Sequence, residues 1–211
     1  MDGRFLTYLV VTAVLIVTPG PDMALVARNA FRGGYPAARA TAFGVGAGIF
    51  VWGAVTAAGL ASALAASAVW FGALKLGGAV YLVALGVRSL LTAARPDRPG
   101  AAARPAGAGQ DSRPKEGGAF AQGLFGNLLN PKAGAIFVAV VPQFTAPGDP
   151  PARLAAMTAA FVVMVTVWLN VYGFAVARAS ARFGGSLRRV LDAAAGVVMI
   201  ALGGRLALER R

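Results

Sequence analysis

The chain has 211 residues, of which 57% are hydrophobic and only 13% are charged, whereas a typical soluble domain is about 45–50% apolar and about 25% charged. The excess of apolar residues lies in long blocks, which predicts an integral membrane protein. The sequence has no Cys and no His, which excludes disulfides, thiolate nucleophiles, zinc sites with the usual ligands and His-based acid–base catalysis.

Six apolar segments follow one another along the chain. Each has about 20 to 27 residues, enough for a helix to cross the hydrocarbon core of a bilayer. Helix is the expected state because isolated strands leave their backbone groups unsatisfied in lipid. We therefore predict an all-α membrane protein with six transmembrane helices at 5–30, 39–65, 69–93, 119–144, 153–178 and 187–208. No cleavage site of the small-x-small kind follows the first segment, so it is expected to be retained.

A segment rich in Pro, Gly, Ala and charge separates the third and fourth helices. Its composition is typical of a flexible loop, which we assign to residues 95–118. The loop divides the chain into two three-helix halves, residues 1–94 and 119–211. Two halves with an odd number of spans are related as an inverted repeat, an arrangement common in secondary transporters.

The net charge of +12 is explained by membrane orientation better than by nucleic-acid binding. Three loops on one side hold 13 of the 20 Lys and Arg residues, among them Arg28, Arg32 and Arg39, and the other side holds 5. The basic side is expected to be cytoplasmic, with both termini outside. An outside position does not fit the basic C-terminal tail RLALERR, because basic residues favour the cytoplasmic side. A five-span arrangement with the C-terminus inside therefore stays open.

The stretch TPGPD interrupts the first apolar segment near its middle. Pro19 and Pro21, with Gly20 between them, should open the helix, and the freed carbonyls must face protein or a water-filled cavity. We expect Thr18 to cap the restarted helix, with Pro19 at its first position. The positive end of that helix is suited to an anionic group such as a carboxylate.

Asp22 lies about one turn into the restarted helix. An acid inside a membrane is costly and is by default a functional residue. Two roles fit: it can bind the ammonium group of a substrate, or it can carry a proton by titrating. The alternative is that its charge only favours the helix N-terminus through the helix dipole.

The fourth apolar segment has a second break, at Asn130-Pro131, about as far into its span as the first. Asn127 and Asn130 are polar amides in an apolar segment, and Lys132 follows the proline. Lys132 needs a partner or water at this depth, so it pairs with Asp22, holds a substrate carboxylate, or reaches back to the membrane surface. Helices interrupted at corresponding positions of two halves indicate a binding site.

Other polar and small residues carry weaker signals. Gly44 and Gly48 are four residues apart on one helix face, which favours close helix packing. Lys75 is expected to extend its charge to the membrane surface. Four polar residues either line a pathway or form hydrogen bonds between helices: Gln122, Gln143, Thr166 and Asn170.

Three stretches together resemble the lysine exporter and homoserine/threonine resistance superfamily, the LysE/RhtB translocators. They are GPDMALVARNAFRGGYPAARATAFGVGAG (Gly20 to Gly48), FGALKLGGAVYLVALG (Phe71 to Gly86) and FAQGLFGNLLNPKAGAIFVAVVPQF (Phe120 to Phe144). The resemblance covers roughly residues 5–94 and 119–145. It implies export of amino acids or close derivatives across the bacterial inner membrane, driven by an ion gradient. It implies that the functional residues include Pro19, Gly20, Pro21, Asp22, Asn130, Pro131 and Lys132.

Many members of that superfamily carry His where Trp52 stands here, so Asp22 would carry more of any proton relay. We therefore predict a secondary exporter that works by alternating access with proton antiport and needs no cofactor. No nucleophile–base pair or metal cluster is visible, and no G-x-x-x-x-G-K-[ST] motif, so neither an enzyme nor an ATP-driven pump is expected. A passive channel and a membrane-embedded assembly subunit stay open as alternatives, as does a homo-oligomer.

Overall fold

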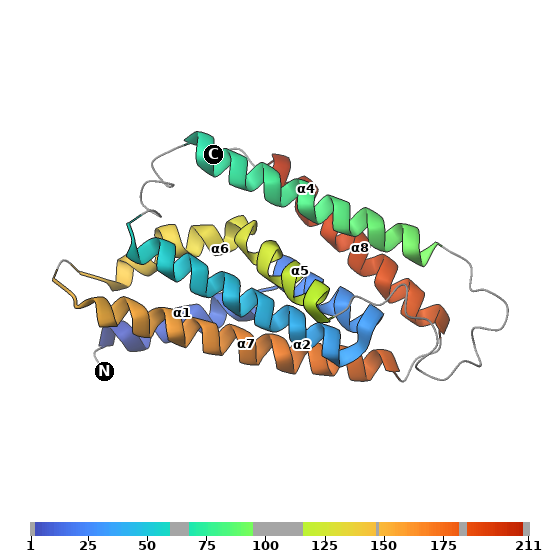
Figure 1. The fold of residues 1–211 in the computed structure, drawn as a ribbon, viewed down its shortest axis with the longest axis horizontal. Helices are drawn as coiled ribbons and strands as arrows, with labels where there is room; N and C mark the ends of the chain where they lie inside the picture. Colours follow the sequence, from blue (N-terminus) through green and yellow to red (C-terminus); the bar gives the residue numbers. More distant parts are fainter. Residues whose placement is uncertain (1–2, 60–67, 95–115, 147, 182–184, 209–211) are drawn as a thin grey trace.

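The computed structural model describes residues 3–59, 68–94, 116–146, 148–181 and 185–208. Within these ranges the chain is helical and contains no strand, which confirms the all-α prediction (Figure 1). The elements are α1 (Gly3–Val17), α2 (Pro21–Ala57), α4 (Ala68–Ala93), α5 (Glu116–Leu128), α6 (Pro131–Ala135), the π-helical turn η2 (Ile136–Val140), the 3-10 turn η3 (Val141–Phe144), α7 (Pro151–Ala181) and α8 (Gly185–Leu208).

Helix α2 consists of two arms that meet at Gly34, whose φ of 70° lies in the left-handed region that glycine tolerates. The Asn29 amide nitrogen donates to the Thr41 hydroxyl at 2.8 Å. In a straight helix these residues would be separated by about 18 Å along the axis. The chain therefore turns back at Gly34. We call residues 21–33 the first arm and residues 35–57 the second arm.

The turn at Gly34 corrects one expectation from the sequence. Arg28, Arg32 and Arg39 were assigned to a loop, but all three lie in helical arms, since a kink at one glycine replaces the loop. Arg28 is only 1% exposed. A buried guanidinium was missed because charge counting treats every Arg near the end of a span as solvated.

Several helix ends differ from the predicted boundaries. The second arm ends at Ala57, not at residue 65, because Gly59 adopts a φ of 73° and terminates the helix. Helix α5 begins at Glu116, so the last three residues of the predicted loop 95–118 are helical. Residues 95–115 of that loop lie outside the described residues, and the division into two halves stays a prediction.

The helices form two groups that lie side by side. Helix α2 packs against both α5 and α7, while α4 runs along α8, which in turn contacts α2 (Figure 1). The tightest approach joins the second arm to α5. A Cβ on Gly44 would overlap the carbonyl of Phe120, and one on Gly123 would overlap the backbone of Thr41. Small residues permit this close packing.

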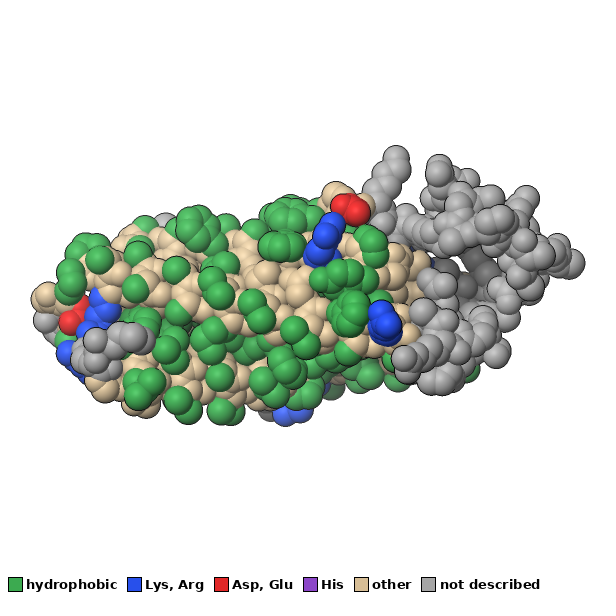
Figure 2. Space-filling view, turned by 90° about the horizontal axis from the view of Figure 1, so that it is seen from below, with side chains coloured by type: hydrophobic (Ala, Val, Ile, Leu, Met, Phe, Trp, Pro, Cys, Tyr) green, Lys and Arg blue, Asp and Glu red, His purple; other side chains and the backbone are tan. Residues whose placement is uncertain are grey.

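The outer surface is apolar over much of its length. Figure 2 shows one face covered largely by hydrophobic side chains, with few charged groups among them. On α7, Val163, Val167 and Val171 are each more than half exposed. An exterior of this kind is what contact with lipid acyl chains requires.

Two of the described helices, α2 and α7, contain a stretch that is long and apolar enough to cross a membrane. Helix α5 and the segment from α6 to Phe144 form a third candidate, bent by 49° at the break between them. The chain is a membrane protein on these grounds. The full set of six spans and the inverted repeat stay predictions.

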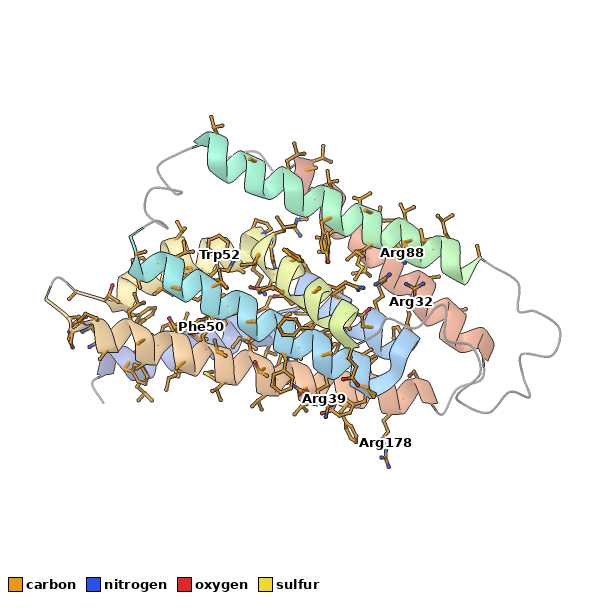
Figure 3. All side chains as sticks on the ribbon, in the orientation of Figure 1. Arg32, Arg39, Phe50, Trp52, Arg88 and Arg178 are labelled. Carbon is orange, nitrogen blue, oxygen red and sulfur yellow. The ribbon has the colours of Figure 1, made fainter. Side chains whose placement is uncertain are left out.

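The labelled arginines gather toward one end of the bundle. Figure 3 shows Arg32, Arg39, Arg88 and Arg178 in its right-hand half. They come from the three predicted loops of the basic side, which follow the first, third and fifth apolar segments. The grouping agrees with that count, and the direction in which this end faces across a membrane stays a prediction.

Candidate functional site

The first break separates α1 from α2. Gly20 is the N-cap of α2 in an extended conformation, with φ −165° and ψ −172°, and no side chain bonds to the first turn. Pro21 takes the first helical position, where its missing N–H has no consequence. The predicted cap by Thr18 is wrong. Its hydroxyl donates backward to the carbonyl of Val14 at 2.8 Å and so ends α1, and Pro21 rather than Pro19 begins α2.

The second break separates α5 from α6. Asn130 is the N-cap of α6, and its side-chain oxygen accepts a hydrogen bond from the backbone N–H of Lys132 at 3.0 Å. Pro131 takes the first helical position, as Pro21 does in α2. At this break, the free backbone N–H of the new helix finds its hydrogen-bond partner in a residue of the same segment.

Lys132 connects the two breaks. Its Nζ donates to the carbonyls of Leu15 and Thr18 at 3.0 and 2.9 Å, both at the end of α1. Those carbonyls belong to the last turn before the break, where the helix can no longer supply partners. Of the roles considered for Lys132, a reach to the membrane surface does not match these contacts. A pair with Asp22, whose charge acts on that of Lys132, stays a prediction, as does the binding of a substrate carboxylate. The cation is held by the opened end of α1.

Asp22 is the second residue of α2 and lies in its first turn. One carboxylate oxygen, Oδ2, accepts a hydrogen bond from the amide of Asn127 on α5 at 3.1 Å. The other, Oδ1, is buried and has no hydrogen-bond partner among the described residues. A buried carboxylate oxygen without a donor is costly, which indicates a place for a donor from a ligand.

The second arm of α2 holds Asn127 in place. A Cβ on Gly48 would lie only 2.6 Å from the side-chain oxygen of Asn127, so the amide occupies the space that glycine leaves. Trp52, labelled in Figure 3, donates from its indole nitrogen to the Asn127 carbonyl at 3.5 Å. Gly48 therefore positions Asn127, and Asn127 orients Asp22.

A partly open cleft lies between the two breaks. Both breaks contribute to one of its walls. Of the residues predicted for a substrate pathway, the cleft is lined by Thr18, Gly20, Pro21, Asp22, Asn130 and Lys132. Pro19, Pro131 and Asn127 are not part of its lining, although Asn127 contacts Asp22 from behind it.

Another part of the lining is apolar and was not predicted. It contains Ile49 of the second arm, Ile136 of η2, and Phe161, Val165 and Leu169 of α7. The three α7 residues recur every fourth position and so share one helix face. The sequence carries the same spacing at Val163, Val167 and Val171, which face outward. Periodicity alone could not tell the cleft face from the lipid face.

A second polar cluster lies outside the cleft. The Arg28 guanidinium donates to the side-chain oxygen of Gln122 at 3.1 Å and to that of Asn29 at 3.3 Å. Asn29 also donates to Gln122 and to Thr41. The cluster ties both arms of α2 to α5, so Gln122 forms hydrogen bonds between helices and does not line the cleft.

The other polar candidates are also outside the cleft lining. Asn170 accepts a hydrogen bond from the Tyr35 hydroxyl at 3.4 Å, and Thr166 contacts Gly46. Gln143 is absent from the cleft wall. The side chain of Lys75 lies outside the described residues.

Comparison with known proteins gives a family and named relatives. The sequence model of the LysE type translocators matches residues 13–210. The threonine efflux protein of Escherichia coli (strain K12) is 28% identical over 207 residues, 98% of each chain. The uncharacterized membrane protein YrhP of Bacillus subtilis (strain 168) is 30% identical over 139 residues, 66% of each chain. The homoserine/homoserine lactone efflux protein of Salmonella typhi is 28% identical over 143 residues, 68% of this chain and 65% of that protein. No solved structure matches.

Proposed function

The chain belongs to the LysE type translocator family, and on that premise we propose that it is a secondary exporter of amino acids or close derivatives across the bacterial inner membrane. The cleft between the two helix breaks is its substrate site. The observation that carries this proposal is that one acid and one base, Asp22 and Lys132, line the same cleft from two distant breaks. Relatives named for the efflux of threonine and of homoserine support the amino-acid class.

The two charges match the two ends of a zwitterion. The ammonium group of the substrate donates to Oδ1 of Asp22, which has no other donor among the described residues. The carboxylate binds Lys132, whose ammonium has three N–H donors and uses two of them on Leu15 and Thr18. The positive end of α2 adds to the attraction for the carboxylate.

Alternating access is supported by the likeness of the two breaks. Each helix restarts with a proline at its first position, Pro21 in α2 and Pro131 in α6. An ionisable residue follows each proline, and the charges of the two residues, Asp22 and Lys132, are opposite. Equivalent breaks in two halves of opposite orientation are the arrangement in which one half rocks against the other around a central site.

Proton antiport follows from the same acid. A proton that reaches Asp22 from the outside removes the negative charge that binds the ammonium, so the substrate leaves. The protonated site then returns to the inside, loses its proton and binds the next substrate. One residue thus binds substrate and proton in turn, which couples the two fluxes.

The test is transport by the purified protein in lipid vesicles with an imposed pH gradient. The flux of a panel of labelled amino acids is measured for the wild type, for Asp22→Asn, and for Asp149→Asn as a control. Asp149 is an acid outside the cleft that pairs with Arg153. We expect gradient-driven flux of at least one amino acid in the wild type and the control, and a loss of at least about 30-fold in Asp22→Asn, as for a buried charge that loses its partner.

Each other outcome contradicts a defined part of the proposal. Full gradient-driven flux in Asp22→Asn would remove Asp22 from the mechanism. Wild-type flux that ignores the pH gradient would indicate a passive channel or another coupling ion. No flux of any amino acid would overturn the substrate class.

A further inference from the structure

The cleft also limits the side chain that the substrate can carry, an inference that rests on the proposed function. We propose that the site selects neutral amino acids with an apolar side chain, such as valine, over hydroxylated amino acids such as threonine and over charged ones. The selection is made by the apolar part of the cleft lining, from α7, Ile49 and Ile136.

Helix α7 presents only apolar side chains to the cleft. Phe161, Val165 and Leu169 are buried and lie along one side of it. The nearby polar residues of α7 have other partners. The Asn170 amide donates to the carbonyl of Thr166 and accepts from Tyr35. The three side chains that α7 contributes to the cleft lining have no group that could form a hydrogen bond with a substrate.

Two further apolar residues extend this wall. Ile49 comes from the second arm of α2, and Ile136 comes from η2, directly after α6. Both are buried. All polar side chains of the lining therefore come from the two breaks, while α7, Ile49 and Ile136 contribute only apolar ones. A substrate held by its ammonium and carboxylate groups at the breaks directs its side chain to this apolar part.

A charged side chain is excluded by the count of charges in the cleft. Among the described residues that line it, Asp22 is the only acid and Lys132 the only base. Both are used by the backbone groups of a zwitterion. A third charge, as in lysine or glutamate, would enter an apolar space without a partner, which is strongly unfavourable.

A hydroxyl group is disfavoured for a related reason. The polar uncharged side chains of the lining, Thr18 and Asn130, belong to the two breaks, where the Thr18 hydroxyl donates to Val14 and the Asn130 oxygen caps α6. The lining from α7, Ile49 and Ile136 has no polar side chain to accept or donate a hydrogen bond to a substrate hydroxyl. Threonine and valine have nearly the same shape and differ by a hydroxyl in place of a methyl. An apolar pocket separates such a pair by up to about 100-fold.

The experiment is competition for the flux of labelled valine in vesicles, with unlabelled valine, threonine, lysine and 3-methylbutanoate, which is valine without its ammonium group. We expect valine to compete at a concentration about 10- to 100-fold lower than threonine. Lysine and 3-methylbutanoate should compete weakly. Threonine that competes as well as valine, while Asp22-dependent flux persists, would overturn the selectivity and leave the proposed function standing.

Two variants of α7 locate the selectivity. Val165→Thr places a hydroxyl in the cleft wall and should shift the ratio of threonine to valine competition at least about fivefold toward threonine. This shift is a fraction of the discrimination of about 100-fold that an apolar pocket can reach. Val163→Thr is the matched control, because Val163 is 61% exposed on the outer face of the same helix, and it should leave the ratio unchanged. An equal shift in both variants, or in neither, would contradict the role of this wall. Strong competition by 3-methylbutanoate would instead contradict the ammonium site at Asp22 and with it the proposed function.

Discussion

The two helix breaks look alike in sequence, yet their backbone groups are satisfied in different ways. The second break is closed from within, because Asn130 caps the helix that follows it. The first has no side-chain cap at Gly20, and the carbonyls of Leu15 and Thr18 depend on Lys132 from the other break. The carbonyls at the first break therefore have hydrogen-bond donors only when the second break lies beside it.

This dependence has a consequence for transport. A movement that separates the two breaks leaves the end of α1 without its donor. The second break keeps its cap through such a movement. We therefore expect the first break to be the part that rearranges and the second to move as a rigid unit.

The largest effect should come from Lys132→Met, which removes the donor shared by the breaks. The two hydrogen bonds of the Lys132 cation contribute about 1.5–3 kcal/mol each, so the thermal midpoint in detergent should fall by about 6 °C or more, and export should be lost. Lys132→Arg should recover part of the stability. Arg178→Met, near the end of α7 and away from the cleft, is the control, and an equal midpoint in Lys132→Met and this control would disprove the dependence.

A smaller effect is expected from Gly48→Ala, which tests the second connection between the breaks. The added Cβ displaces the Asn127 side chain, and Asp22 loses the hydrogen bond that orients it. Export should fall about tenfold, the equivalent of one such bond, and the thermal midpoint should fall by less than in Lys132→Met. Gly204→Ala adds the same atom where nothing lies within 4 Å. Unchanged export in Gly48→Ala would show that Asn127 does not position Asp22.

The smallest effects are expected from changes at the N-cap positions of the two breaks, Asn130 and Gly20. Asn130→Ala removes the cap of α6 and should destabilise the protein by about 0.5–2 kcal/mol, whereas Asn130→Asp keeps an acceptor and should restore the loss. Gly20→Ala should change stability by less than about 0.5 kcal/mol. Its backbone is extended, and the new Cβ would lie 3.5 Å from the Lys132 ammonium, an ordinary contact. Thermal unfolding of the three variants measures the difference, and equal losses at Asn130 and Gly20 would mean that the breaks are not satisfied differently.

Much of the fold could be predicted from local signals. Described helices lie in all six apolar segments, and both breaks occur where proline removes a backbone donor. The ends of helices were less predictable. Thr18 was expected to begin α2 but ends α1, because a threonine hydroxyl can bond to the carbonyl one turn back as readily as it can cap the next helix.

The candidate site could be predicted only in part. Asp22 and Lys132 stood out because charge inside an apolar segment is rare, and both line the cleft. The apolar wall did not stand out, since Val165 in the cleft and Val163 on the outside belong to the same uniformly apolar helix. Arg28 was misplaced for the opposite reason, because its burial depends on Gln122, which is 94 residues away.

By itself the sequence determined where the helices are interrupted and which charges lie beside the interruptions. Both properties follow from covalent structure and from the length of apolar runs. Only the tertiary structure decided that the cation of the second break completes the first, that Gly48 and Asn127 orient Asp22, and which face of α7 lines the cleft. Those contacts join segments more than 70 residues apart, and such pairs meet only when the helices pack.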